Sequence, residues 1–379
     1  VMSIDRENKT VTVKGLDSEK TYEESYDKLI LSTGAVPIKP MLPGISNSKI
    51  YALRTVEDTL SIREEIINRD MKSAVVVGGG FIGVEMAENL RELGMEVSLV
   101  EKQNQVLGQL DRDMVSFVHS HMRAKGINLL LGSGVEGFKE IPSGISVLVE
   151  NREPIKADIV ILAMGVMPDS NLAKSANLEL GLKGSIVVNE HMQTSDQDIY
   201  AVGDAVQITN SVTGLKAIIS LAGPANKQGR IAADNITGIE STYYGSAASS
   251  ILKVFDMTVA STGINERTAK AAGILYEKII LSPSSRASYY PGGNAMTMKV
   301  LFDKQTENIL GAQIVGFDGV DKRIDVLATA MQAGMMVTKL KDLDLAYAPP
   351  YSSAKDPVNM SGFLAENVTS GKVRQFFYE

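Results

Sequence analysis

The sequence feature that most constrains the fold is a glycine-rich turn, Gly78-x-Gly80-x-x-Gly83, between an apolar run and a helical segment. Residues 73–77 are the short apolar run that a buried parallel strand requires, and the segment after the turn, 84–93, has helical spacing. A second apolar strand follows the helix. Strand, glycine turn, helix and strand in this order form a βαβ unit, so the chain is predicted to belong to the α/β class with a parallel sheet.

Each glycine of the turn has its own physical role in binding a dinucleotide. Gly78 permits the tight turn, Gly80 lets the backbone approach a pyrophosphate, and Gly83 lets the helix pack closely on the strand. Phe81 and Ile82, between the last two glycines, belong to the same expected site. The helix N-terminus would attract the phosphates.

Glu101 completes this pattern at the tip of the second strand, 23 residues after Gly78. Its carboxylate would accept a hydrogen bond from the adenosine ribose 2′-hydroxyl, and its charge would repel a 2′-phosphate. NADH is therefore favoured over NADPH, although Lys102 beside it softens the preference. The alternative is a glycine-rich turn with a surface glutamate.

The charge balance excludes two classes of partner. The 379 residues hold 38 Lys and Arg against 45 Asp and Glu, a net charge of −7, without a basic cluster. Nucleic acid and anionic membrane surfaces require such a cluster, so neither is expected to bind. No apolar run reaches the roughly 18 residues of a membrane-spanning helix. We therefore expect a cytoplasmic protein that acts on a small molecule.

The cysteine and histidine contents restrict the chemistry. The sequence has no cysteine and three histidines, His119, His121 and His191. Disulfides, thiolate metal sites and thiol nucleophiles are excluded within these residues, and the histidines are too badly spaced for a zinc cage, so no metal site is expected. Catalysis must then use a carboxylate, Lys or Tyr, or a bound cofactor.

Further turns follow other apolar strands. Thr33-Gly34 and Gly165 each end such a strand and precede a proline, and this repetition indicates two similar nucleotide-binding halves. Residues 199–203 form another strand, which ends before Asp204. A carboxylate at this place can accept hydrogen bonds from sugar or ribityl hydroxyls, or it can cap the next helix, and the sequence leaves both interpretations open.

The rest of the chain divides into segments that differ in composition and hydrophobic pattern. Residues 1–31 alternate as a strand meander, and the proline-rich loop 37–43 suits a crossing between domains. Residues 243–248 are a small-residue linker, and the sequence from 249 onward indicates a separate α+β domain. The other expected elements are helices at 55–71, 112–125, 225–237 and 320–334, strands at 127–131, 158–162, 186–188, 297–301 and 309–315, and a hairpin at 134–150.

The order of these motifs resembles the FAD-dependent pyridine nucleotide-disulfide oxidoreductases. The turns at Gly34 and Gly165 flank the glycine-rich fingerprint, the strand before Asp204 follows, and Leu-Ala-Gly-Pro-Ala-Asn-Lys-Gln-Gly-Arg comes next at 221–230. Residues 347–359, Tyr-Ala-Pro-Pro-Tyr-Ser-Ser-Ala-Lys-Asp-Pro-Val-Asn, are similar to the coenzyme A disulfide reductase branch. That branch is close to the NADH oxidases and peroxidases and includes members fused to a rhodanese domain. The resemblance covers essentially the whole chain.

The resemblance implies two Rossmann-like nucleotide-binding domains, with the NAD domain inserted in the FAD domain, and a C-terminal α+β dimerisation domain. The implied boundaries are 1–54 and 169–245 for FAD, 55–168 for NAD(P) and 246–379 for dimerisation. The family's FAD pyrophosphate turn and redox cysteine do not occur in these residues, so we expect an N-terminally truncated piece of a longer protein. Residues 373–379 resemble the start of a rhodanese module.

The resemblance also implies roles for individual residues. Gly165 would form the floor of the NAD(P) site, and Glu85 would lie near the nicotinamide. Ala222 would lie at the isoalloxazine edge of the flavin, where a helix N-terminus would stabilise negative charge on the reduced ring. The residues that match the family's other flavin contacts are Thr33, Gly34, Gly203 and Asp204.

Tyr347 and Tyr351 are the implied catalytic residues. In this branch they come from the dimerisation domain of one subunit of a homodimer and reach the partner's redox site. A phenol beside a sulfur can donate a hydrogen bond or a proton, whereas the alternative for either residue alone is packing of a proline-rich loop. Ser352-x-x-Lys355 matches the spacing of serine acyl-enzymes, but Pro357 is expected to disfavour the helix which that chemistry needs.

The implied reaction passes a hydride from NADH or NADPH to FAD and then two electrons to a cysteine sulfur. The substrate would be a low-molecular-weight disulfide, persulfide or polysulfide, with coenzyme A derivatives first. Three alternatives are an NADH oxidase or peroxidase of the same fold, a non-catalytic nucleotide-binding module, and a flavoprotein that passes electrons to a protein partner.

Overall fold

The chain passes three times between two units in the computed structural model, which describes residues 1–377. The first unit combines residues 1–38 with 166–248, and the second combines 39–165 with the chain from 249 onward. The first crossing lies in the proline-rich loop, and the last lies at the end of the small-residue linker. Tyr378 and Glu379, which end the segment expected to lead into a rhodanese module, lie outside the described residues.

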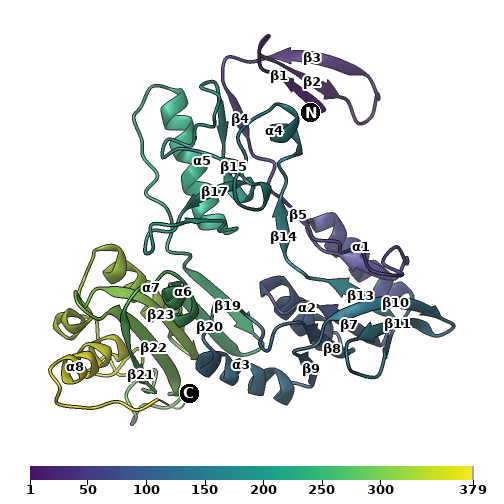
Figure 1. Ribbon diagram of the computed structural model, residues 1–379. Helices are drawn as coiled ribbons and strands as arrows, with labels where there is room; N and C mark the ends of the chain where they lie inside the picture. Colours follow the sequence, from purple (N-terminus) through teal and green to yellow (C-terminus); the bar gives the residue numbers. More distant parts are fainter. Residues whose placement is uncertain (378–379) are drawn as a thin grey trace. The chain divides into compact units, whose positions relative to one another are not determined.

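The first unit is built from short strands and two helices (Figure 1). Its strands are β1 (Ser3–Asp5), β2 (Thr10–Lys14), β3 (Thr21–Ser25), β4 (Leu29–Leu31), β5 (Ala35–Pro37), β14 (Val166–Pro168), β15 (Ile186–Val187), β16 (Ile199–Ala201), β17 (Val206–Thr209) and β18 (Lys216–Ala217). Its helices are α4 (Asn171–Ser175), α5 (Ala222–Ile236) and the 3-10 turns η1 (Leu182–Gly184) and η2 (Gly203–Ala205). The meander β1-β2-β3 is antiparallel, whereas β4 pairs in parallel with β16.

The second unit begins with a five-stranded parallel sheet in the order β6-β13-β7-β8-β9. Its strands are β6 (Ile50–Ala52), β7 (Ser73–Val77), β8 (Glu96–Glu101), β9 (Ile127–Leu131) and β13 (Ile159–Leu162). Its helices are α1 (Val56–Asn68), α2 (Phe81–Glu92) and α3 (Arg112–Ala124). A smaller antiparallel sheet contains β10 (Val135–Ile141), β11 (Gly144–Val149) and β12 (Ile155–Ala157).

Both faces of the parallel sheet are covered, which explains the continuous apolar run of β7. Val76 packs in the cluster that contains Val84 of α2 and Met114 of α3. Val75 packs in a different cluster, with Val147 of the small antiparallel sheet. A strand buried on both faces must be apolar at every position, so it reads as a run rather than an alternation.

The C-terminal part of the second unit is an antiparallel sheet in the order β19-β20-β23-β22-β21, and it shares a buried cluster with the helices of the parallel sheet. Its strands are β19 (Ser250–Val254), β20 (Met257–Gly263), β21 (Tyr276–Leu281), β22 (Met296–Asp303) and β23 (Ile309–Gly316). Its helices are α6 (Glu266–Ala271), α7 (Val320–Gln332), η3 (Val337–Asp342) and α8 (Pro357–Thr369). No helix within residues 1–377 is both long enough and apolar enough to cross a membrane.

Three helices begin where the sequence analysis did not place them. α2 begins at Phe81 rather than at residue 84, because Gly80 serves as its N-cap. α5 begins at residue 222 rather than 225, because Pro224 lies in the first turn, where its missing N–H needs no partner. The expectation that Pro357 disfavours a helix just beyond Lys355 is wrong, because Pro357 is the first residue of α8, a position at which proline is common, although residues 352–355 before it are not helical.

Candidate functional site

The glycine-rich turn between β7 and α2 is closed tightly against the end of β13. Gly78 has a φ of +110°, and a Cβ on it would lie 2.2 Å from the Ala163 carbonyl oxygen. A Cβ on Gly83 would lie 1.9 Å from the Gly78 carbonyl oxygen. A Cβ on Gly80, in contrast, would meet no atom within 4 Å. The space over Gly80 is therefore open, as the close approach of a pyrophosphate requires.

The N-terminus of α2 adds hydrogen-bond donors to this open space. Its N-cap, Gly80, has no side chain with which to satisfy the first N–H groups of the helix. Phe81 and Ile82 form the first turn and are half-buried. Because these N–H groups have no intrahelical acceptor, they and the helix dipole together favour a bound phosphate.

Glu101 ends β8 beside the same turn. Its Oε2 accepts a hydrogen bond from the Gly79 N–H at 2.6 Å, and its Oε1 accepts one from the Gln103 N–H at 2.7 Å. It lines a cavity of about 320 Å³ together with Gly79 and Gly80, whereas Lys102 is exposed and does not line it. The structure therefore brings Glu101 and the turn together, and contact between this carboxylate and a ribose stays a prediction.

Gly165 and Glu85 belong to the same unit as the turn. Gly165 follows β13 and has a φ of +91°, two residues after Ala163, whose carbonyl oxygen faces Gly78. Glu85 lies on α2 and lines a cavity of about 680 Å³ formed largely by α1 and α2. Burial, with a contribution from Glu88, raises the pKa of Glu85. Glu85 is exposed on the helix surface, and a carboxyl group that lines a cavity and has a raised pKa is a candidate for a functional role.

In the first unit, the expected flavin residues meet at one edge of the β4–β16 pair. Because the two strands are parallel, Thr33-Gly34 and Gly203-Asp204 leave the pair at the same carboxyl edge. Gly34 and Gly203 have φ values of +74° and +78°, which favour glycine. The Gly203 N–H donates to the Gln228 Oε1 at 2.7 Å, and this bond ties the edge to α5.

The surroundings of this edge bear on one of the two interpretations of Asp204, that it caps the next helix. Asp204 is half-buried in η2, and α5 has Leu221 as its N-cap, so Asp204 does not cap that helix. Ala222 is the first residue of α5, whose N-cap makes no side-chain hydrogen bond. The Thr33 hydroxyl donates to the Asp169 carbonyl oxygen. Helix capping is therefore excluded for Asp204, and contact with a ribityl hydroxyl stays a prediction.

The loop between η3 and α8 places Tyr347 beside a tyrosine that the sequence analysis missed. The hydroxyl oxygens of Tyr347 and Tyr289 lie 3.1 Å apart and form a hydrogen bond. Tyr347 is 46% exposed, Tyr289 is 74% exposed and Tyr351 is 71% exposed. The hydrogen bond with Tyr289 raises the pKa of Tyr347. The available signal for Tyr289 was an aromatic pair in a proline- and glycine-containing loop, Tyr289-Tyr290-Pro291.

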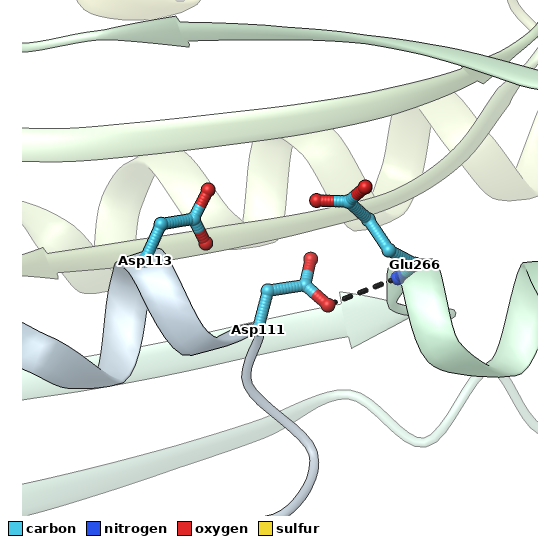
Figure 2. Close-up of side chains that lie close together, drawn as sticks. All are labelled: Asp111, Asp113 and Glu266. Atoms are coloured by element: carbon cyan, nitrogen blue, oxygen red, sulfur yellow. Dashed lines mark hydrogen bonds between the residues drawn. The ribbon is translucent and has the colours of Figure 1, made fainter. Parts of the chain in front are cut away.

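Three carboxylates gather where α3 meets the C-terminal sheet (Figure 2). Oxygen atoms of Asp111, Asp113 and Glu266 lie within 4.8 Å of one another. The Nζ of Lys299, a fully buried residue of β22, lies 3.0 Å from Asp111 and 2.8 Å from Asp113, and it also pairs with Glu266. Lys299, together with Lys278 on Glu266, therefore offsets much of the negative charge, and we assign the cluster as an ion network that joins α3 to β22 and α6.

The fold has two strand edges of the kind at which α/β proteins bind nucleotides, and comparisons with known proteins give the family. The family model described as pyridine nucleotide-disulphide oxidoreductase matches residues 1–229, and the model of its dimerisation domain matches 249–357. The chain belongs to the pyridine nucleotide-disulphide oxidoreductase family. The predicted family and α/β class are confirmed, and the enzyme is an oxidoreductase that uses FAD and NAD(P)H.

The relatives found in these comparisons include both reductases and oxidases. A coenzyme A disulfide reductase of Staphylococcus haemolyticus and an NADH oxidase of Methanocaldococcus jannaschii are each 35% identical, over 97% of this chain and 82% of theirs. The reduced CoADR-RHD of Bacillus anthracis is 48% identical with a TM-score of 0.97, over 99% of this chain and 68% of that one. An NAD-dependent persulfide reductase from A. fulgidus is 42% identical with a TM-score of 0.94, over 98% of this chain and 69% of that one.

Proposed function

We propose that this protein uses NAD(P)H to reduce low-molecular-weight disulfides, persulfides or polysulfides, with coenzyme A derivatives as the first substrates to test. One observation carries the proposal. The glycine-rich turn and the flavin-type strand edge occur together in a chain that is 48% identical to a protein described as CoADR-RHD. The similarity to a persulfide reductase supports sulfur as the acceptor.

The residues of the chain would divide the work as follows. The turn at Gly78 and the N-terminus of α2 would bind the NAD(P)H pyrophosphate, and Glu101 would orient the adenosine ribose. The strand edge at Thr33 and Gly203 would hold FAD. When bound, FAD supplies a centre that accepts two electrons from NAD(P)H and passes them to sulfur. The accepting thiol is not among these 379 residues, because they contain no cysteine.

The tyrosine pair would act at the sulfur end of the reaction. Reduction of a disulfide releases a thiolate, which a phenol can stabilise by donating a hydrogen bond or a proton. The hydrogen bond with Tyr289 raises the pKa of Tyr347, which favours the protonated form that can donate. Tyr351 would contribute from the same loop. We also propose that two copies of the chain associate through the dimerisation domain, so that these tyrosines serve the partner subunit.

The domain boundaries expected from the sequence form part of this proposal. Residues 1–54 and 169–245 would bind FAD, 55–168 would bind NAD(P)H, and 246–379 would dimerise. A cytoplasmic location stays a prediction.

The proposal is tested with the full-length protein that the gene encodes, by recording its absorbance spectrum and its rate of NAD(P)H oxidation. We expect absorbance at the oxidised flavin bands and NADH or NADPH oxidation that depends on added coenzyme A disulfide or polysulfide. A colourless protein that binds NADH would instead support the non-catalytic module. Because one relative is an NADH oxidase, the control is turnover with oxygen alone, and full activity there would overturn the choice of acceptor.

Replacing Glu101 with alanine tests the ribose contact. We expect the KM for NADH to rise about tenfold, because a charge-assisted hydrogen bond to the ligand is lost. Steady-state kinetics with NADH and NADPH measure the effect. The KM for NADPH should fall relative to the KM for NADH, because the charge that repels a 2′-phosphate is gone. Glu96→Ala, an exposed residue at the other end of β8, is the matched control. Unchanged NADH affinity in Glu101→Ala would count against the ribose role.

A further inference from the structure

A buried arginine lies beneath the two loops that carry the tyrosine pair. The Tyr289 loop (residues 282–295) joins β21 to β22, and the Tyr347 loop (residues 343–356) joins η3 to α8. Arg323 projects from α7 and is 1% exposed. The tips of the loops, in contrast, expose both tyrosines. The loops are therefore anchored at their buried bases, and their functional groups are at their exposed ends.

Arg323 contacts the base of each loop through one guanidinium nitrogen. Its Nη2 lies 3.0 Å from the Ser285 carbonyl oxygen, in the Tyr289 loop. The same nitrogen lies 3.3 Å from the Tyr351 carbonyl oxygen and 3.1 Å from the Ser352 Oγ, both in the Tyr347 loop. Ser285 and Ser352 are themselves 1% and 0% exposed. A single charged group thus bridges Ser285 and Tyr351, which lie 66 residues apart in the sequence.

The counter-ion of Arg323 is Asp356, at the end of the Tyr347 loop. Its Oδ2 lies 3.0 Å from the Arg323 Nη2 and accepts a hydrogen bond from the Ser352 hydroxyl at 2.6 Å. Its Oδ1 accepts a hydrogen bond from the Val358 N–H at 3.0 Å, so the same carboxylate caps α8. Burial raises the pKa of Asp356, but these hydrogen bonds and Arg323 outweigh it and lower the pKa. The pair is therefore ionic.

The loops also bond to each other just above this ion pair. The Ala287 N–H donates to the Ser352 carbonyl oxygen at 2.9 Å. Two residues beyond Ala287 is Tyr289, whose hydroxyl meets that of Tyr347. A hydrogen bond between two exposed hydroxyls competes with water and adds little by itself. How often the two phenols meet must then depend on the rigidity of the bases that carry them.

We propose that Arg323 is a positioning residue for the reduction of the sulfur substrate, holding the Tyr289 and Tyr347 loops so that their hydroxyls stay paired. This inference rests on the proposed function, because the pairing matters for catalysis only if the tyrosines act at the sulfur. Arg323 does not touch the substrate and acts through the loops. Its planar guanidinium makes several directed hydrogen bonds, which an ammonium group cannot reproduce.

Arg323→Lys tests the inference with the charge opposite Asp356 retained. Lysine is one atom shorter and lacks the planar fork, so we expect the rate of disulfide reduction by the pre-reduced enzyme to fall about tenfold. The rate of flavin reduction by NADH should not change, and stopped-flow absorbance separates the two half-reactions. Asp321→Asn, at an exposed position of the same helix, is the control. An unchanged disulfide rate, or an equal loss in both half-reactions, would overturn the inference.

A double-mutant cycle separates positioning from a merely structural role. If Arg323 acts through the pair, Arg323→Lys should cause no further loss in a Tyr347→Phe background. The same fold-loss in both backgrounds would overturn the inference. Where Arg323→Lys does not fold, Ser352→Ala replaces it in the same cycle, because it removes one contact of the network. If Tyr347→Phe alone leaves disulfide reduction unchanged, the proposed function of the tyrosines fails, which is a distinguishable result.

Discussion

Replacing Lys299 with methionine is expected to lower the free energy of unfolding by about 3–5 kcal/mol at pH 7, as removal of one partner of a buried ion pair does. Lys299 is fully buried and pairs with three carboxylates, Asp111, Asp113 and Glu266. Methionine fills a similar volume, so the loss is of charge rather than of packing. Lys278 would still pair with Glu266, but Asp111 and Asp113 would lose the cation with which they pair. Urea denaturation of both proteins measures the difference.

The penalty of Lys299→Met should depend on pH in a defined direction. Burial raises the pKa of Glu266, but hydrogen bonds from Lys278, Lys299 and Tyr276 outweigh it and lower the pKa from 4.5 to about 2. Because the folded-state pKa is the lower one, this carboxylate stabilises the fold above pH 4.5 and loses that effect as the pH falls toward about 2. The difference between wild type and variant should therefore narrow in acid.

Lys304→Met is the matched control for this prediction. Lys304 follows β22, its side chain is 60% exposed, and its Nζ lies 3.0 Å from Glu277. Exposed pairs contribute little to stability, so almost no change is expected at either pH. A penalty for Lys299→Met that is equally small, or that stays constant from pH 7 to pH 3, would contradict the assignment of the cluster as a stabilising ion network.

The local elements that the sequence predicts well are those in which a single physical cause decides the structure. Gly78 adopts a φ that only glycine tolerates readily, and β7 is buried on both faces. One short stretch of sequence is therefore enough to predict both the turn and the strand. The first residue of a helix is harder to predict from the sequence, because it depends on which backbone N–H groups need a partner. Pro224 and Pro357 both lie inside a first turn, where their effect is the opposite of that in a helix interior.

The parts of the candidate site that sequence patterns do not predict are those made by long-range pairing. Tyr289 lies 58 residues from Tyr347, and nothing local in either loop specifies the other. Lys299 resembles an ordinary strand lysine until the fold brings α3 and α6 against it. The sequence predicts that Arg323 lies in a helix, but it does not predict that this charged side chain is among the largest that are fully buried. Hydrophobic periodicity assigns a residue to one face of a helix or strand, but it does not say which other element packs against that face.

Tyr347→Phe is expected to slow disulfide reduction by the pre-reduced enzyme about a hundredfold, in the range that loss of a general acid causes. Flavin reduction by NADH should continue at the wild-type rate, because the tyrosine acts only on the sulfur. Tyr351→Phe should also slow the sulfur half-reaction. Tyr244→Phe, an 85% exposed tyrosine of the first unit, is the matched control. An equal loss in both half-reactions would show that the assignment to the sulfur half-reaction is wrong.

The pH dependence of the same half-reaction identifies the group that donates the proton. The hydrogen bond with Tyr289 raises the pKa of Tyr347, so the phenol should remain a donor to higher pH than an isolated tyrosine would. Tyr289→Phe removes that bond and should move the alkaline decline of the rate to lower pH, while the rate on the neutral plateau falls less than in Tyr347→Phe. An alkaline decline that stays in place in Tyr289→Phe would mean that the observed hydroxyl pair is not the proton donor, even if Tyr347 is needed for turnover.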